Sequence, residues 1–315
     1  LAFGRRYAAE IYLAAQSLRD EANPDEETRA ELQRTLWAAC VWELSMLLFV
    51  GRPALLTGAL VPWWQLHLCD RTPAEQALPA LEASPSPDAQ PEYWPTLRSL
   101  VACGLPDLAL RLLRRHGALL NASTSGDEQL LLERLETLIE LMPKLNEPEL
   151  MQPQPEEVPL GQLEQAALHE FKLRHHVWAS DLQALARDAD AVPSLPTASE
   201  IAFTARLLGG DTSAIDRTVG QSWHGRMIAR LLYQQPTTLR WQLREVLDAC
   251  VPQGERSSLD PFSAALVAAL TDDPYATLRA VRTAFGDGWL PAHLWDMLWR
   301  AGAVGVDTMD GPGSI

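Results

Sequence analysis

The sequence predicts an all-α fold, an irregular solenoid of about a dozen helices. Apolar residues recur at steps of three and four along much of the chain, which is the period of an amphipathic helix. Strand signals are nearly absent, because β-branched residues are sparse and no long stretch alternates between apolar and polar residues. Helix start signals recur at short intervals, so we expect short helices packed in antiparallel pairs. No strict repeat of fixed period accompanies them, and the stack is therefore expected to be irregular.

The first clear start signal is Thr72-Pro73-Ala74-Glu75, in which we expect Thr72 to cap the helix. Asp260-Pro261 and Asp273-Pro274 repeat a similar signal thirteen residues apart, each before a helix rich in alanine and leucine. Loops are expected between the helices, where proline, glycine and polar residues gather. They are residues 20–27, 84–91, 121–127, 146–159, 190–197 and 252–260.

The stretch 125–145 is the most regular helix in the sequence. Ser125 and Glu128 form a capping-box pattern at its start, and Pro143 marks its expected end. The expected buried face consists of Leu131, Leu135, Leu138 and Met142. Glutamates occupy the opposite face, so this helix is expected to cover a core on one side and meet water on the other.

Composition and charge restrict the function. Hydrophobic residues make up 47% of the 315 residues, which is enough to bury a core. The formal net charge is −15, so phosphate backbones and anionic lipid would be repelled and nucleic acid is not an expected partner. The densest basic cluster is Arg111, Arg114 and Arg115, which we expect to be a solvated helix face.

Cysteine use and apolar runs point to a protein of the cytosol or nucleus. Cys40, Cys69, Cys103 and Cys250 are far apart in the sequence, which favours reduced, buried thiols over disulfides or zinc. The apolar stretches 44–50 and 58–64 look too short to cross a bilayer, so no membrane insertion is expected.

Residues 289–302, WLPAHLWDMLWRAG, look reactive at first sight. His293 and Asp296 lie one turn apart on a helix expected to start near Pro291, and such a pair could orient an imidazole for base catalysis. No nucleophile motif, phosphate loop or carboxylate cluster accompanies them. We therefore expect a packing helix with Leu294, Trp295 and Leu298 on its buried side and no catalytic residue; a hydrolase using His293 and Asp296 is an alternative.

Other candidate sites are weaker. His175 and His176 are adjacent, so they point about 100° apart on a helix, and His169 lacks a third partner at ligand spacing. No metal or cofactor is therefore expected. The eleven tryptophans lie in apolar helical patterns and are expected to pack in the core, although Trp63-Trp64 could include an exposed anchor for a partner.

Several stretches together resemble one known family. SWHGRMIARLLYQQPT at 222–237 is similar to a signature with a tryptophan followed by R-L-L-Y-x-x-P-T, and 289–298 is similar to W-x-x-A-H-L-x-D-x-L. YWPTLRSLVACG at 93–104 resembles a tryptophan-led helix ending in glycine, and 41–50 with 63–70 resembles an early helix pair. Order and spacing also match. On these motifs the chain resembles the eighty-five-kilodalton scaffold nucleoporins of the Y-complex.

This resemblance implies the ancestral coatomer fold, a helical solenoid with trunk and crown that doubles back on itself. It implies a structural subunit of the nuclear pore complex at the nuclear envelope, supporting mRNA export and protein import without catalysis. The implied partners are a WD40 β-propeller homologous to the Sec-thirteen protein and other Y-complex nucleoporins. A vesicle-coat scaffold with the same fold is the alternative.

The resemblance also assigns structural roles to motif residues. They are Trp94, Gly104, Trp223, Arg230, Tyr233, Pro236, Trp289, His293 and Asp296. We expect them to fix packing and register, and the sequence does not identify partner-binding residues. Residues 1–315 are expected to form one solenoid domain with an irregular tail at 303–315. The chain starts at Leu1, and we expect a fragment without the propeller-binding blade and most of the family's C-terminal tail.

Overall fold

The computed structural model describes residues 2–21, 25–53, 55–120, 126–144, 160–286 and 288–305. It is 78% helical, which confirms the all-α prediction. The described residues contain no β-strand, and Leu55 and Leu239 form an isolated antiparallel bridge. The helices outnumber the expected dozen within these ranges, because several are short and closely spaced along the chain.

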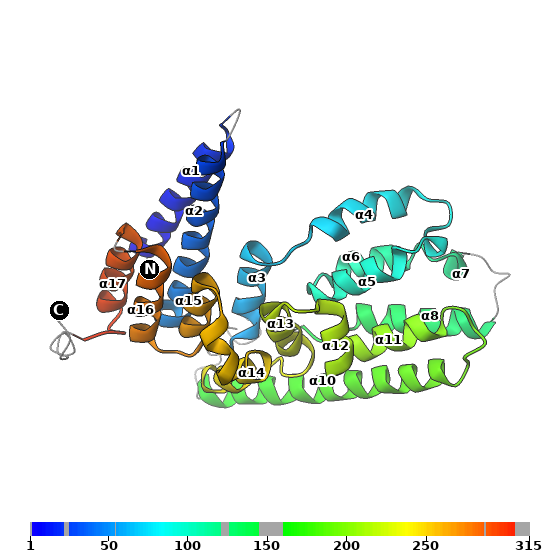
Figure 1. Ribbon diagram of the computed structural model, residues 1–315. Coiled ribbons are helices and arrows are strands. Elements are labelled where there is room, and N and C mark those ends of the chain that lie inside the picture. Colours follow the sequence, from blue (N-terminus) through cyan, green and yellow to red (C-terminus); the bar gives the residue numbers. More distant parts are fainter. Residues whose placement is uncertain are drawn as a thin grey trace. The chain divides into compact units, whose positions relative to one another are not determined.

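The chain forms two compact units (Figure 1). The terminal unit combines the two ends of the chain, Leu1–His67 and Leu239–Ile315, and the inserted unit is Leu68–Thr238. The polypeptide therefore leaves the terminal unit after His67 and returns to it at Leu239. That the whole chain acts as a single domain stays a prediction.

The terminal unit pairs the first helices with the last ones. Its helices are α1 (Ala2–Arg19), α2 (Glu26–Ser45), the π-helix η1 (Met46–Gly51), α3 (Thr57–His67), η3 (Arg240–Gln242), α14 (Leu243–Cys250), η4 (Gln253–Ser258), α15 (Pro261–Leu270), α16 (Pro274–Phe285) and α17 (Trp289–Arg300). The hairpin of α1 and α2 packs through α2 on α15, which itself pairs with α16 (Figure 1). Of the expected tail, residues 303–305 follow α17 without helix and 306–315 lie outside the described residues.

Helix α2 is the centre of this unit. Asp25 caps it by accepting a hydrogen bond from the Thr28 amide at 2.7 Å. Trp42 is fully buried, and its indole nitrogen donates to the Gly4 carbonyl on α1 at 3.0 Å. A Cβ atom at Gly4 would lie 2.6 Å from the sulfur of Met46, so glycine permits this close approach.

The continuous helix Glu26–Gly51, formed by α2 and η1, is long and apolar enough to cross a membrane by length and composition. The expectation that the apolar stretches are too short was wrong on that point, because flanking residues extend the helix beyond 44–50. Of its most apolar window, 56% is buried inside the protein. More than half of this window therefore packs against the rest of the protein.

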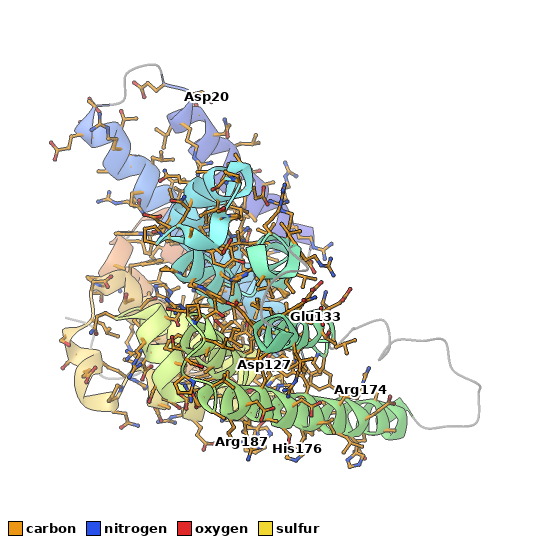
Figure 2. The ribbon with its side chains drawn as sticks, turned by 90° about the vertical axis from the view of Figure 1, so that its right-hand side faces the viewer. Asp20, Asp127, Glu133, Arg174, His176 and Arg187 are labelled. Atoms are coloured by element: carbon orange, nitrogen blue, oxygen red, sulfur yellow. The ribbon has the colours of Figure 1, made fainter. Side chains whose placement is uncertain are left out.

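The inserted unit is built around one long helix. Its helices are α4 (Thr72–Ala83), η2 (Pro87–Ala89), α5 (Tyr93–Ala102), α6 (Pro106–Leu113), α7 (Gly117–Leu120), α8 (Gly126–Glu140), α10 (Leu160–Asp190), α11 (Ala198–Leu208), α12 (Thr212–Val219) and α13 (Trp223–Tyr233). One apolar core runs from α4 to α13, with α8 and α11 packed along α10. His176 and Arg187 point away from the packed helices on the outer side of α10 (Figure 2).

Two of the three expected start signals are confirmed. The Asp260 and Asp273 carboxylates accept hydrogen bonds from the Ser263 and Ala276 amides at 3.0 and 2.9 Å. The prediction for Thr72 was wrong, because Thr72 is already the first helical residue of α4. Its own amide donates to the Asp70 carboxylate at 3.1 Å, and the N-cap position is Arg71, whose side chain makes no capping bond.

The helix expected at 125–145 is α8, which ends at Glu140, before Pro143. Ser125 lies outside the described residues, so its capping role stays a prediction. The fully buried face differs in part from the expected one and consists of Leu131, Leu132, Leu135 and Ile139. Leu138 is only partly buried, and Met142, also partly buried, lies beyond the end of α8 at Glu140. The helix packs against α6, α7, α10 and α11 with Leu132 and Ile139 buried instead.

Candidate functional site

Two of the motif stretches, 93–104 and 222–237, meet inside the inserted unit. The Tyr233 hydroxyl at the end of α13 donates a hydrogen bond of 2.6 Å to the Val101 carbonyl of α5. Both residues are buried, and burial raises the pKa of Tyr233 above its usual range, so the hydroxyl remains protonated and can donate. We call this contact the Tyr233–Val101 junction.

Glycine shapes the α5 side of the junction. Gly104 has a φ of +67°, a left-handed conformation that glycine adopts without steric cost. Its amide donates to the same Val101 carbonyl at 2.8 Å, so this oxygen accepts two hydrogen bonds. At the other end of α5, Trp94 is buried and its ring meets the Tyr93 ring edge-on at 5.4 Å. Trp94 and Gly104 therefore lie at the two ends of one buried helix.

The α13 side starts from a capped tryptophan. Trp223 is the first residue of α13 and is buried, and the preceding Ser222 accepts a hydrogen bond from the Gly225 amide at 3.2 Å. The ring of His224 lies 3.0 Å from the Ser222 hydroxyl. Burial lowers the pKa of His224 to about 4, so this imidazole is neutral at physiological pH.

Arg230 and Pro236 lie near the end of α13. The Arg230 carbonyl accepts hydrogen bonds from the amides of Gln234 and Gln235, both at 2.9 Å. The Arg230 Nε atom is buried without a hydrogen-bond partner among the described residues. Pro236 falls in the turn after the helix, where its missing amide leaves no gap in the helical hydrogen bonds.

The stretch 289–302 lies in the terminal unit, and α17 begins at Trp289 rather than near Pro291. The expectation that Trp289 packs in the core was wrong, because Trp289 is 48% exposed; His293, to which a packing role was assigned, is exposed as well. Both rings flank Tyr7 of α1, at 5.6 and 4.8 Å between centroids. The buried face of α17 consists of Leu290, Leu294, Met297 and Leu298. Trp295 is only partly buried, because it lies at the border of this face.

The structure does not join His293 to Asp296 as a catalytic pair. Both carboxylate oxygens of Asp296 lie within hydrogen-bonding distance of Arg300 Nε, at 2.9 and 2.8 Å. The His293 ring packs on Tyr7 instead. Arg300 is the better partner for Asp296, because residues four positions apart share a helix face and an ion pair joins two full charges.

The other candidates, the basic cluster and His175 of α10, also make contacts within the protein. In the basic cluster, Arg111 pairs with Glu82 at 2.5 Å and Arg114 with Glu136 at 2.7 Å. His175 lies between the rings of Phe171 and Trp178 in α10, and the described residues include no group of three or more potential metal ligands.

Trp63 and Trp64 pack in the core as expected, and the alternative of an exposed anchor is not found, since both residues are 5% exposed. The Trp63 indole donates to the Cys40 carbonyl at 3.1 Å, which fixes α3 against α2. None of the four cysteines forms a disulfide; Cys40, Cys103 and Cys250 are buried and Cys69 is partly so.

One polar cluster has no counterpart in the sequence predictions. His67 Nε2, at the end of α3, lies 2.9 Å from a Glu43 carboxylate oxygen of α2 and 3.4 Å from the Tyr12 hydroxyl of α1. The three residues come from three different helices, so no local spacing could have indicated the contact.

Together, these contacts define a class. The motif residues are used for capping, packing and helix-to-helix hydrogen bonds, and the described candidates form no reaction centre. A helical stack of this kind is an α-solenoid scaffold protein.

Comparison with known families identifies which scaffold. The family model described as Nup85 Nucleoporin matches residues 1–311, and the chain belongs to this family. Members of the family are structural scaffolds of the nuclear pore complex, which places the protein with other nucleoporins at the nuclear envelope. Among curated protein sequences, none matches this chain.

Proposed function

We propose that this protein is a scaffold subunit of the Y-complex outer ring, which supports nucleocytoplasmic transport, including mRNA export and protein import. The family match over residues 1–311 carries the proposal. The mechanism is geometric: packed helices hold their outer faces in fixed positions, and neighbouring subunits bind those faces. Trp94, Gly104, Trp223 and Tyr233 would then contribute by keeping the helices in register.

The proposed partners are a WD40 β-propeller homologous to the Sec-thirteen protein and other Y-complex nucleoporins. The net charge of −15 supports protein partners over nucleic acid, because an acidic surface repels phosphate. The buried character of Glu26–Gly51 supports attachment to the envelope through other proteins without insertion. We further propose that the whole chain acts as one solenoid domain.

Affinity purification of the tagged native protein, followed by mass spectrometry, tests the assignment. Recovery of the propeller together with other Y-complex nucleoporins is the expected result. Recovery of vesicle-coat subunits in their place would move the same fold to the secretory pathway and overturn the proposal. Cells expressing the tag alone provide the control for non-specific capture.

We also propose that the protein has no enzymatic role. The pairing of Asp296 with Arg300 supports this, because it occupies the carboxylate that a His293 base would need. His293→Gln should therefore leave partner recovery unchanged. Loss of partners by a variant that still melts like the wild type would indicate a site at His293.

A further inference from the structure

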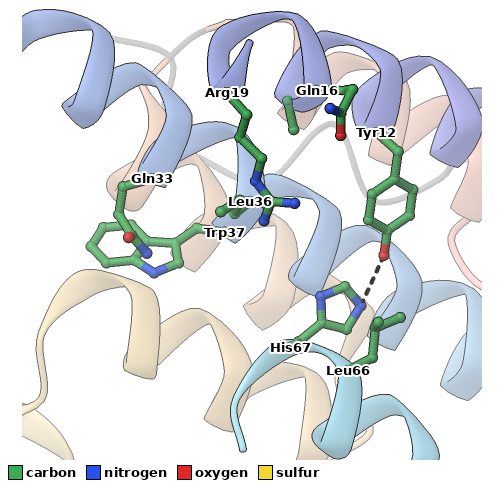
Figure 3. Close-up of a pocket in the computed structure, with 9 residues that line it drawn as sticks. Tyr12, Gln16, Arg19, Gln33, Leu36, Trp37, Leu66 and His67 are labelled. Atoms are coloured by element: carbon green, nitrogen blue, oxygen red, sulfur yellow. Dashed lines mark hydrogen bonds between the residues drawn. The ribbon is translucent and has the colours of Figure 1, made fainter. Parts of the chain in front are cut away.

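A cavity of about 460 Å³ opens between α1, α2 and the end of α3 in the terminal unit (Figure 3). This volume falls within the range of small-molecule binding pockets. Its walls include Tyr12, Gln16, Arg19, Leu36, Trp37 and Leu66, with His67 at one end. Only Leu66 and His67 fall in a family-like stretch, 63–70, and the motif residues given structural roles above include none of the wall residues, so their arrangement requires a separate explanation.

One wall of the cavity is apolar and open to water. Trp37 is 39% exposed and Leu66 is 64% exposed, although most large apolar side chains of α2 and α3 are buried. The Trp37 ring is stacked on Phe262 of α15 at 4.8 Å between centroids, so its position is fixed before anything binds. An exposed, pre-positioned tryptophan beside a cavity is typical of a binding surface.

The polar end of the cavity satisfies its own charges. Burial alone would raise the pKa of Glu43, but hydrogen bonds from His67 and Tyr12 hold the pKa of this carboxyl below its usual range. The carboxylate is therefore ionised and already bonded within the protein. Glu43 does not line the cavity, and His67 contacts both this carboxylate and the Tyr12 hydroxyl.

Arg19 gives the cavity its charge. Its guanidinium points into the space between Leu36 and His67 (Figure 3). It makes no hydrogen bond or ion pair with the described residues, whereas the nearby Gln16 amide donates to Asp20 at 2.8 Å. An arginine without a partner beside an apolar wall presents five donors to an incoming carboxylate.

We propose that this cavity docks an acidic peptide segment of a partner protein. A glutamate or aspartate carboxylate of that segment would pair with Arg19, and an adjacent apolar side chain would pack against Trp37 and Leu66. Charge complementarity selects this occupant: the cavity presents Arg19, a cation without a partner among the described residues, while the chain as a whole carries a net charge of −15. An acidic ligand would thus be attracted by Arg19 itself and not by the charge of the chain as a whole.

Selection of random displayed peptides on the full chain tests the proposal. Peptides enriched by the wild type should combine acidic with aliphatic or aromatic residues. A fluorescently labelled enriched peptide should bind Arg19→Glu about tenfold more weakly or worse, and Leu66→Ser should also weaken it. Arg5→Glu is the matched control, because Arg5 is exposed on the same helix and does not line the cavity.

Three outcomes would overturn the proposal. They are enriched peptides without acidic bias, equal binding to Arg19→Glu and the wild type, and equal weakening by Arg5→Glu. Self-association that Arg19→Glu abolishes, in the absence of peptide, would instead assign the cavity to a second copy of the chain. Peptide binding to the chain does not depend on which complex the protein joins. Failure of the docking proposal would therefore leave the scaffold assignment unaffected.

Discussion

The Tyr233 hydroxyl and the Val101 carbonyl are separated by 132 positions in the sequence and joined by a hydrogen bond of 2.6 Å. The bond connects the end of α13 to the last turn of α5, where Gly104 also turns its amide toward the same oxygen. Two motif stretches that are only separate signatures in the sequence thus form one buried junction. The junction accounts for the need for both a tyrosine and a glycine at these positions.

Replacement of Tyr233 by phenylalanine measures the hydrogen bond itself. We expect a loss of about 1–2 kcal/mol in the free energy of unfolding, because the ring stays buried while the Val101 carbonyl loses the hydroxyl donor. Urea denaturation followed by circular dichroism gives the value. Tyr275→Phe is the control, since the Tyr275 hydroxyl accepts from the Gly305 amide at an exposed position. An equal cost for both variants would contradict the role of the junction.

Two tryptophans of the terminal unit should differ in their contribution to stability. Trp42→Ala is expected to cost about 3–5 kcal/mol, because it empties a fully buried site and removes the indole hydrogen bond to the Gly4 carbonyl. Trp289→Ala should cost only about 1–2 kcal/mol, because about half of that ring is already in water. Thermal unfolding of both variants compares them. A larger shift for Trp289 would show that its exposed side packs on something further.

His224 should make stability depend on pH. Its pKa is lowered from 6.5 to about 4 by burial, so the unfolded chain binds the proton more tightly than the folded one. The neutral, buried His224 therefore makes its full contribution to the free energy of unfolding above about pH 6.5. As the pH falls toward 4, that free energy should decrease by about 2–3 kcal/mol. His224→Gln should flatten the curve in this window. A variant with the wild-type pH dependence would contradict the assignment.

The Asp273 cap can be tested on an exposed surface, where packing changes do not interfere. Asp273→Ala removes the acceptor for the Ala276 amide and should cost about 1 kcal/mol. Asp181→Ala is the matched control, because Asp181 is an exposed aspartate inside α10 rather than at a helix start. We expect that change to stay within about 0.5 kcal/mol. Equal effects would show that loss of charge, and not loss of the cap, governs the result.

Short sequence signals predicted helix features well where those features depend only on neighbouring residues. Aspartate before proline predicted the caps of α15 and α16, because capping depends on a few neighbouring residues. The same reasoning wrongly predicted Thr72 as a cap, because the Thr72 amide donates to Asp70 two residues earlier. Helix boundaries of this kind depend on competition between nearby side chains, which the sequence does not resolve.

Predictions about exposure were less reliable. Trp289 belongs to an apolar pattern but is half exposed, while Trp63 and Trp64 are buried where an exposed anchor was considered. A helical pattern specifies which residues share a face. It does not specify how much of that face the neighbouring helices cover.

The sequence by itself determined the helical class, the capped starts of α15 and α16, and the family, because periodicity, caps and ordered motifs are properties of the chain. Only the tertiary structure decided that Tyr233 bonds to Val101, that Asp296 pairs with Arg300 rather than His293, and that Arg19 points into a cavity. The first and third depend on which helices come together across long stretches of chain, and the second on which of two possible partners on one helix is engaged. Burial and shape complementarity across the whole core decide which helices pair over long distances in the sequence. No short stretch of sequence contains that information.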